Sequence, residues 1–292
     1  MENILRPIYQ EWASQPNTLG VIIIEKAKNA LPVTDTFDSV LLVITKGSSL
    51  PMSVKHYEYE DKKVSLYTVT DTKIKEWILL GTNRRVFEWI INGIIVYDRN
   101  EYATNLKEEL LSFPIKERSM KMGLEFAKLI RRYQEGKAFF ESKHYLDAYN
   151  NVLHALHHLA RLAVIEHGIH PEVTVWNQVR QIEPHIYMLY KEVAESEETL
   201  EKRLELLFLA SDFLVHSRAK KGANHLIEIL SEREDPWSIG EIMDHPELSV
   251  YSVDLEIMLA FLVEKQIVRV SKVETKGVGL YHRKYCVGTK ID

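Results

Sequence analysis

The chain has 292 residues, of which 46% are hydrophobic and 27% are charged, and this composition is typical of a soluble protein that is folded throughout. The formal net charge of -5 gives no general attraction to phosphate polymers, so a nucleic-acid partner would need a local basic patch. The single cysteine, Cys286, excludes an intrachain disulfide and a cysteine-rich zinc site. No apolar run approaches the roughly 20 residues of a membrane span. We therefore expect a cytoplasmic protein without membrane contact.

Residues 1–114 predict a small mixed sheet. Two apolar runs of strand length, "LGVIIIEK" and "DSVLLVITK", are followed by "VKHYEYEDKKVSLYTVT", an aromatic and β-branched stretch that indicates a hairpin with its turn at Asp61 and Lys62. After these come segments with helical periodicity and one more strand, "GIIVYD". The helices of this part must therefore cover the sheet.

Residues 115–234 predict an all-α helical bundle. The strand signal disappears, and apolar residues recur at spacings of three and four over 119–142, 144–168 and 199–218. Such spacings place the apolar side chains on one face of each helix. We therefore expect at least three long amphipathic helices that pack against one another.

Residues 235–292 predict a small winged-helix domain. Pro236 blocks continuation of the preceding helix and marks the boundary. Beyond it, "SIGEIMDHPEL" and "SVDLEIMLAFLVEKQIV" predict two helices, and two strand-like runs follow about Lys276 and Gly277. Two helices followed by a two-stranded wing is the element order of a winged helix.

The order of these three parts resembles the nucleotidyltransferase superfamily. In particular, it resembles the kanamycin-nucleotidyltransferase-like proteins, whose catalytic sheet domain precedes a helical substrate-binding bundle. With the appended winged helix, it is similar to nucleotidyltransferase-like proteins of Gram-positive bacteria. The expected fold class is thus α+β: a nucleotidyltransferase-like mixed sheet domain, an all-α bundle and a small winged-helix domain.

The resemblance implies a metal site that can be compared with the sequence. Members carry Gly-Ser at a strand end, then Asp-x-Asp opening the next strand, and a third carboxylate on a later strand. The first two carboxylates hold Mg²⁺ on the nucleotide phosphates, and the third binds a second metal that activates the attacking hydroxyl. Gly-Ser holds the terminal phosphates through backbone N–H groups.

Only one of the three carboxylates has a counterpart in this chain. Ile24 and Glu25 stand where Gly-Ser is expected, and Asp38 matches the first Asp. The second Asp falls on Val40, and the third carboxylate falls near Ser65. Asp38 is therefore the candidate catalytic residue, whereas the structural alternative is an Asp at a strand start that accepts hydrogen bonds from nearby backbone N–H groups. No cofactor is expected, and Mg²⁺ is expected only if transferase activity remains.

The bundle carries a group of histidines with two alternative meanings. His154 and His158 are four residues apart, a spacing that can hold zinc, but no acidic partner follows, so we expect interface histidines and no metal. Arg161 and His167 match a short pattern of HEPN-class ribonucleases, in which His is the general acid or base and Arg stabilises the phosphorane. Such bundles usually dimerise to build the site, so this alternative includes a homodimer.

The ligand site expected from the resemblance lies between the sheet domain and the bundle. A small molecule or nucleotide would contact Asp38 and Lys46 on one side. On the other side we expect a cluster from the bundle: Trp176, Asn177, Gln178 and Arg180. The structural alternative makes Trp176 a core anchor and Asn177 a turn cap.

The charges of the winged helix disfavour nucleic acid as a partner. Its longer helix carries Asp254, Glu256 and Glu264 against Lys265 alone, and carboxylates that face phosphates oppose binding. The wing carries cations that allow only a weak phosphate contact: Lys272, Lys276, Arg283 and Lys284. A protein partner fits these charges better.

Three functional hypotheses follow from the sequence. The first is a catalytically degenerate nucleotidyltransferase-like protein that binds a small ligand or a partner. The second is a residual metal-dependent nucleotidyltransferase. The third is a HEPN-type ribonuclease or a winged-helix adaptor for nucleic acid or protein.

Overall fold

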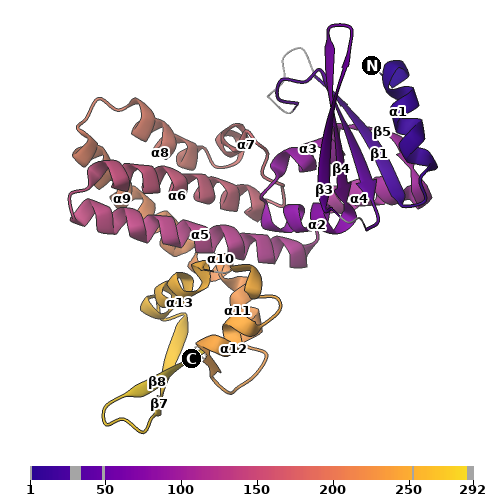
Figure 1. The fold of residues 1–292 in the computed structure, drawn as a ribbon. Coiled ribbons are helices and arrows are strands. Elements are labelled where there is room, and N and C mark those ends of the chain that lie inside the picture. Colours follow the sequence, from indigo (N-terminus) through magenta and orange to yellow (C-terminus); the bar gives the residue numbers. More distant parts are fainter. Residues whose placement is uncertain (1, 27–33, 48–49, 252, 288–292) are drawn as a thin grey trace. The chain divides into compact units, whose positions relative to one another are not determined.

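The computed structural model describes residues 2–26, 34–47, 50–251 and 253–287, and it divides the chain into two compact units, Met1–Pro114 and Ile115–Asp292 (Figure 1). Each unit has its own apolar core. Within the described residues, none of the helices combines the length and the apolar character that crossing a membrane requires.

The N-terminal unit is built on a five-stranded mixed sheet. Its strands are β1 (Thr18–Glu25), β2 (Ser39–Thr45), β3 (Met52–Tyr59), β4 (Lys62–Thr70) and β5 (Ile94–Asp98). Their order across the sheet is β3-β4-β2-β1-β5, and β2 and β4 form the parallel pair. The predicted strands and the hairpin between β3 and β4 are confirmed.

Helices cover both faces of this sheet. Three of them, α2 (Asp71–Leu80), α3 (Arg84–Asn92) and α4 (Tyr102–Ser112), lie on the face that includes Val40 and Leu42. The other face packs against α1 (Glu2–Ser14) through Leu5. All seven residues of β2 are buried, because a central strand between two helical layers is apolar on both sides.

The C-terminal unit begins with the helical bundle. The three long predicted helices are confirmed as α5 (Ile115–Glu141), α6 (Tyr145–Glu166) and α9 (Leu200–Ser217). Shorter helices connect them and follow them: α7 (Val175–Ile182), α8 (Pro184–Glu195), α10 (Ala219–Gly222) and α11 (Asn224–Leu230). In Figure 1, α5 and α6 run alongside each other.

The remaining elements form the expected winged helix with one extra strand. They are β6 (Trp237–Ser238), α12 (Ile239–Asp244), a 3₁₀ turn (Ser249–Tyr251), α13 (Asp254–Glu264), β7 (Val268–Glu274) and β8 (Tyr281–Val287). The strand order β6-β8-β7 adds a third strand to the predicted two-stranded wing. Two residues of strand carry too little alternation to be detected in a sequence.

Candidate functional site

Asp38 lies immediately before β2 and is held by backbone hydrogen bonds. Its Oδ2 accepts a hydrogen bond from the backbone N–H of Lys63 at 2.9 Å, and its own N–H donates to the Lys63 carbonyl oxygen at 2.8 Å. The backbone N–H of Lys26 donates to the carbonyl oxygen of Asp38 at 2.9 Å. The carboxylate thus makes the backbone contact that the structural alternative predicts, and it joins the starts of β2 and β4.

The two positions at which the resemblance implies the second and third metal-binding carboxylates lie inside the sheet domain. Val40 on β2 and Ser65 on β4 are direct partners in the parallel ladder. Val40 is 1% exposed and belongs to the apolar core under α2, α3 and α4, and Ser65 is fully buried. The described residues contain no group of three or more histidine, cysteine or acidic side chains arranged to hold a metal ion.

The strand end that would cradle phosphates is also acidic. Glu25 is the last residue of β1, and its Cα is paired with that of Ser39, the residue after Asp38. Glu25 is exposed at this strand end. An ionised carboxylate accepts hydrogen bonds and has none to donate to a phosphate, so Glu25 does not replace the phosphate-binding Gly-Ser.

Lys46 lies at the opposite end of β2 from Asp38. Asp38 precedes the first residue of the strand and Lys46 follows the last one. Eight residue steps at about 3.3 Å each separate them by about 26 Å. The two residues therefore do not line one small-ligand site, contrary to the expectation from the sequence.

Changing Asp38 to alanine is expected to lower stability by about 1 kcal/mol, because the Lys63 N–H then loses its acceptor. Asp38→Asn should lose less, since the amide oxygen still accepts a hydrogen bond. Thermal unfolding of both variants, with the exposed carboxylate variant Glu58→Ala as control, measures this difference. An unchanged or raised melting temperature for Asp38→Ala would contradict a structural role and indicate a residue kept for ligand binding.

Glu125, a buried carboxylate of α5, is in contact with one histidine and one arginine of α6. His158 Nδ1 lies 2.7 Å from Glu125 Oε2, and Arg161 Nη1 lies 3.7 Å from the same oxygen. Burial alone would raise the pKa of Glu125, but the hydrogen bond and charge of His158, with the charges of Arg161 and Lys128, outweigh it and lower the pKa to about 2. His158 and Arg161 are thus engaged in an interhelical charge network.

Arg161 and His167 belong to separate networks. His167 Nδ1 donates to the Ala163 carbonyl oxygen at 2.9 Å and lies 3.9 Å from Glu183 Oε1. Six helical residues turn the two side chains about 120° apart around α6. No contact described in the structure joins the guanidinium of Arg161 to the imidazole of His167.

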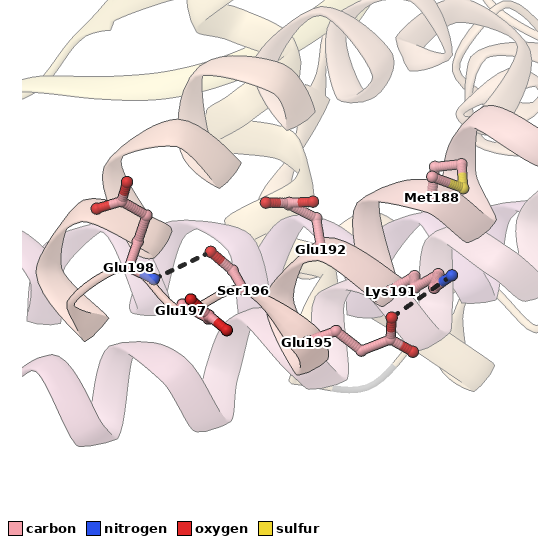
Figure 2. A pocket seen from close by; sticks show the side chains of 7 residues that line it. All are labelled: Met188, Lys191, Glu192, Glu195, Ser196, Glu197 and Glu198. Atoms are coloured by element: carbon pink, nitrogen blue, oxygen red, sulfur yellow. Dashed lines mark hydrogen bonds and ion pairs between the residues drawn. The ribbon is translucent and has the colours of Figure 1, made fainter.

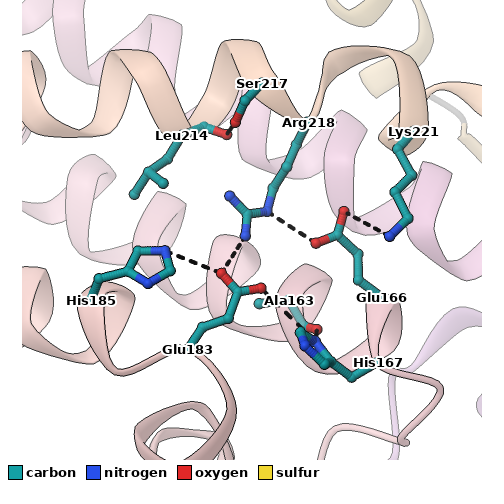
Figure 3. A network of polar contacts seen from close by, with 9 residues as sticks. All are labelled: Ala163, Glu166, His167, Glu183, His185, Leu214, Ser217, Arg218 and Lys221. Atoms are coloured by element: carbon teal, nitrogen blue, oxygen red, sulfur yellow. Dashed lines mark hydrogen bonds and ion pairs between the residues drawn. The ribbon is translucent and has the colours of Figure 1, made fainter.

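The network beside His167 is centred on Arg218, just after α9 (Figure 3). Its Nε lies 3.1 Å from Glu166 Oε2, and its second terminal nitrogen is bonded to Glu183 Oε2. His185 Nε2 lies 3.2 Å from that same Glu183 oxygen. These contacts tie the ends of α6 and α9 to the start of α8. The two partners of Arg218 are at least 35 positions away from it, so they leave no local signal in the sequence.

Two of the expected ligand residues of α7, Trp176 and Gln178, are engaged in contacts with their neighbours. Trp176 stacks on Tyr190 with ring centroids 4.0 Å apart, and the His157 ring packs edge-on against both. Gln178 bridges the preceding loop: it accepts from the Glu172 N–H at 2.9 Å and donates to the His170 carbonyl oxygen at 3.0 Å.

Asn177 and Arg180 are the exposed members of this set. The Arg180 guanidinium lies 5.7 Å from the Tyr187 ring centroid. Asn177 donates its backbone N–H to the Thr174 carbonyl oxygen at 3.0 Å. The side chains of these two residues are the accessible polar groups of the α7 set.

The helix that would read a DNA groove is packed against α5. Arg131 of α5 forms an ion pair with Asp254, and the Phe126 and Phe261 rings meet edge to face at 5.9 Å. The exposed residues along α13 form a narrow stripe: Glu256, Ala260 and Glu264. This stripe offers two carboxylates and no cation to a partner.

A hollow of about 710 Å³ lies at the end of α8 and is lined by acidic side chains (Figure 2). Its lining residues are Met188, Lys191, Glu192, Glu195, Ser196, Glu197 and Glu198. Lys191 Nζ lies 3.5 Å from Glu195 Oε2, which leaves the lining with an excess of negative charge. A run of glutamates between helices resembles an ordinary solvated turn, so this surface has no distinctive signal in the sequence.

Fold and domain order define a nucleotidyltransferase-like protein, and the chain belongs to that family. The family model for nucleotidyltransferase-like domains matches residues 1–118, that for the YgxA-like substrate binding domain matches 119–218, and a helix-turn-helix domain model matches 224–287. The helix-turn-helix match includes α11, which contacts β8.

Two relatives cover the chain from end to end. The YgxA protein of Bacillus subtilis (strain 168) is 56% identical over 292 residues, covering 100% of this chain and 99% of that protein. The crystal structure of a nucleotidyltransferase-like protein from Exiguobacterium sibiricum 255-15 is 42% identical, covers 99% of this chain and 100% of that chain, and superposes with a TM-score of 0.84. The expected resemblance and the α+β fold class are confirmed.

Proposed function

We propose that this protein is a catalytically degenerate member of its family that binds a small ligand or a partner and does not transfer nucleotides. The observation that carries the proposal is the pairing of Val40 with Ser65 inside the sheet. These are the positions at which the resemblance requires the second and third metal carboxylates. An aspartate at either place would have to be buried in the core between β2, β4 and the covering helices.

The donor chemistry supports the same conclusion. Mg²⁺ requires a near-octahedral set of oxygens, usually with one or two carboxylates in addition to substrate phosphates. Asp38 is a single carboxylate whose Oδ2 is already engaged by the Lys63 N–H. The residues at this edge of the sheet therefore do not fit a two-metal site.

The ligand is proposed to contact Asn177 and Arg180, the accessible members of the α7 set. Arg180 supplies a cation and Asn177 an amide, and both are exposed. Such groups suit a small molecule with an anionic or polar end, including a nucleotide bound without metal. Trp176 and Gln178 are positioning residues in this proposal, since one is stacked on Tyr190 and the other holds the loop before α7.

The winged helix is proposed to bind protein rather than nucleic acid. Its longer helix is packed on α5 and exposes carboxylates, and these oppose a phosphate backbone. We also propose that the protein is cytoplasmic, where a lone cysteine stays reduced. No contact favours the ribonuclease alternative, since Arg161 is paired with Glu125 and His167 faces Glu183.

The decisive measurement is nucleotide binding with and without Mg²⁺. Calorimetry and thermal unfolding with ATP, CTP and GTP should give weak or no binding, and adding Mg²⁺ should not change it, because Asp38 alone does not supply the carboxylates that hold the ion on the phosphates. Asp38→Asn serves as the test variant and Glu58→Gln as its control. Micromolar, Mg²⁺-dependent binding that Asp38→Asn removes and Glu58→Gln retains would restore the residual transferase hypothesis.

A further inference from the structure

Helix α9 is apolar on two sides. Its inner side is buried in the bundle through Leu204, Leu207, Phe208 and Val215. A second group follows at spacings of three and four on the opposite side, and we call it the outer stripe: Leu206, Leu209, Ala210 and Phe213.

The outer stripe is exposed in the single chain. Leu209 is 70% exposed, Phe213 is 74% exposed and Leu206 is 46% exposed. A helix with apolar residues on both sides is normally covered on both sides, because a contiguous exposed apolar surface marks an interaction site. Leu206 and Ala210 also line a cavity of about 160 Å³ between α8 and α9, which extends the apolar surface toward Leu189 and Val193.

The charges at the two ends of α9 have opposite sign. At its N-terminal end Glu198 lines the acidic hollow of Figure 2 and Glu201 follows in the first turn, while the neighbouring Lys202 is paired with Glu205 at 2.7 Å. At its C-terminal end lie Lys220 and Lys221, both exposed. Figure 3 shows Lys221 beside Glu166, and Lys221 Nζ lies 3.8 Å from Glu166 Oε1. The apolar stripe therefore lies between an acidic end and a basic end.

We propose that the outer stripe is the interface of a homodimer, in which α9 of one copy packs antiparallel to α9 of a second copy. A two-fold axis between Leu209 and Ala210 places Leu206 opposite Phe213 of the other copy, so the stripe complements itself. The same axis places Glu198 of each copy near Lys220 and Lys221 of the other copy. A parallel pairing would instead place the acidic ends together, so the charges select the antiparallel arrangement.

The contact has to extend beyond α9 itself. A specific interface buries about 800 Å² on each partner, which is more than a few side chains of one helix supply. Leu189 and Val193 of α8 line the same cavity as Leu206 and Ala210 of the stripe, so the proposed contact includes this side of α8. The occupant of the stripe is thus a second copy of this chain.

Sedimentation and light scattering over a range of micromolar concentrations test the dimer. The wild type should be dimeric, and Phe213→Glu should raise the dimer dissociation constant by at least about 30-fold, because the two-fold axis repeats the lost contact. Val253→Glu is the matched control, since Val253 is equally exposed at 72% and lies outside α9. A wild type that is monomeric throughout, or a control that dissociates equally, would overturn the proposal.

Charge reversal tests the antiparallel arrangement. Glu198→Lys and Lys220→Glu replace exposed residues, so each variant should fold normally and weaken the dimer, and the double variant should recover the wild-type affinity. Failure of the double variant to recover would rule out the antiparallel pairing.

Cross-linking tests the position of the axis. In a Cys286→Ser background, Ala210→Cys should form a disulfide between copies, since it lies next to the axis. Ser217→Cys should not, because the axis places its two copies about 22 Å apart along α9. The reverse result would place the axis elsewhere and contradict the proposed interface.

Discussion

Replacing Glu125 by alanine is expected to lower the free energy of unfolding by about 3 to 5 kcal/mol, one of the largest effects of any single substitution in this chain. Glu125 is 7% exposed on α5, and its carboxylate is the acceptor for His158 Nδ1 at 2.7 Å. Alanine would leave Arg161 partly buried without its counter-charge and would open a void between α5 and α6. Urea unfolding followed by circular dichroism measures the loss.

The pH dependence of this contribution follows from the lowered pKa of Glu125. The folded-state pKa is about 2, against an ordinary value of 4.5, because the contacts with His158, Arg161 and Lys128 outweigh the effect of burial. A carboxyl whose pKa is lowered by folding contributes stability above its unfolded pKa, and that stability is lost as pH falls toward its folded pKa. The difference corresponds to about 3 kcal/mol, present at pH 7 and lost progressively below pH 4.5.

Glu125→Gln isolates the charge, and Glu135→Gln provides the matched control. Glu135 lies on the same helix and pairs with Arg131 and Arg132 at 3.6 and 3.4 Å, but its side chain is 35% exposed. An exposed pair of this kind contributes about 0 to 1 kcal/mol. We expect the stability gap between wild type and Glu125→Gln to shrink on acidification, and a gap of the same size near pH 2.5 and pH 7 would argue against the buried charge network.

The elements of the fold could be predicted where the pattern is local. The sequences of β1 and β2 are short and apolar, because both faces of the sheet are covered. In α5, α6 and α9, apolar residues recur every three or four positions over a long segment. The covering of the second face by α1 was not predicted. Its amphipathic pattern is short, and its place is set by apolar contacts of Leu5 with the distant strands β1, β2 and β4.

The contacts of the candidate sites could not be predicted in the same way. Asp38 and Lys63 are 25 positions apart, and Glu125 and His158 are 33 positions apart, so neither pair leaves a spacing signal in the sequence. Knowing which strands are neighbours was needed to see that Val40 and Ser65 adjoin. The prediction that Lys46 and Asp38 line one ligand site is wrong, because the two residues lie at opposite ends of the extended strand β2.

The second large effect is expected at Gly123, where α5 meets the winged-helix domain. A Cβ at this position would lie 2.0 Å from the Tyr251 hydroxyl oxygen and 2.9 Å from its Cζ. Tyr251 is 1% exposed and its hydroxyl is 2.9 Å from His225 Nδ1, whose Nε2 lies 3.3 Å from Glu247. Since the ring cannot move into solvent without breaking this chain of contacts, Gly123→Ala should cost about 1 to 3 kcal/mol despite the better helix propensity of alanine.

A double-mutant cycle with Tyr251→Leu separates the clash from any other effect of alanine in α5. With the tyrosine ring removed, the same Gly123→Ala change should become neutral or stabilise by up to about 1 kcal/mol, because only the helix propensity remains. The sign of the alanine effect should therefore depend on residue 251. Equal destabilisation in both backgrounds, measured by urea unfolding, would show that the close approach of Tyr251 to α5 is not what requires glycine at position 123. With Tyr251 present, Gly123→Ala should also speed hydrogen exchange at the backbone amides of His225 and Tyr251 before those of the rest of the bundle. These two residues join the winged helix to α5, so the destabilisation should be felt there first.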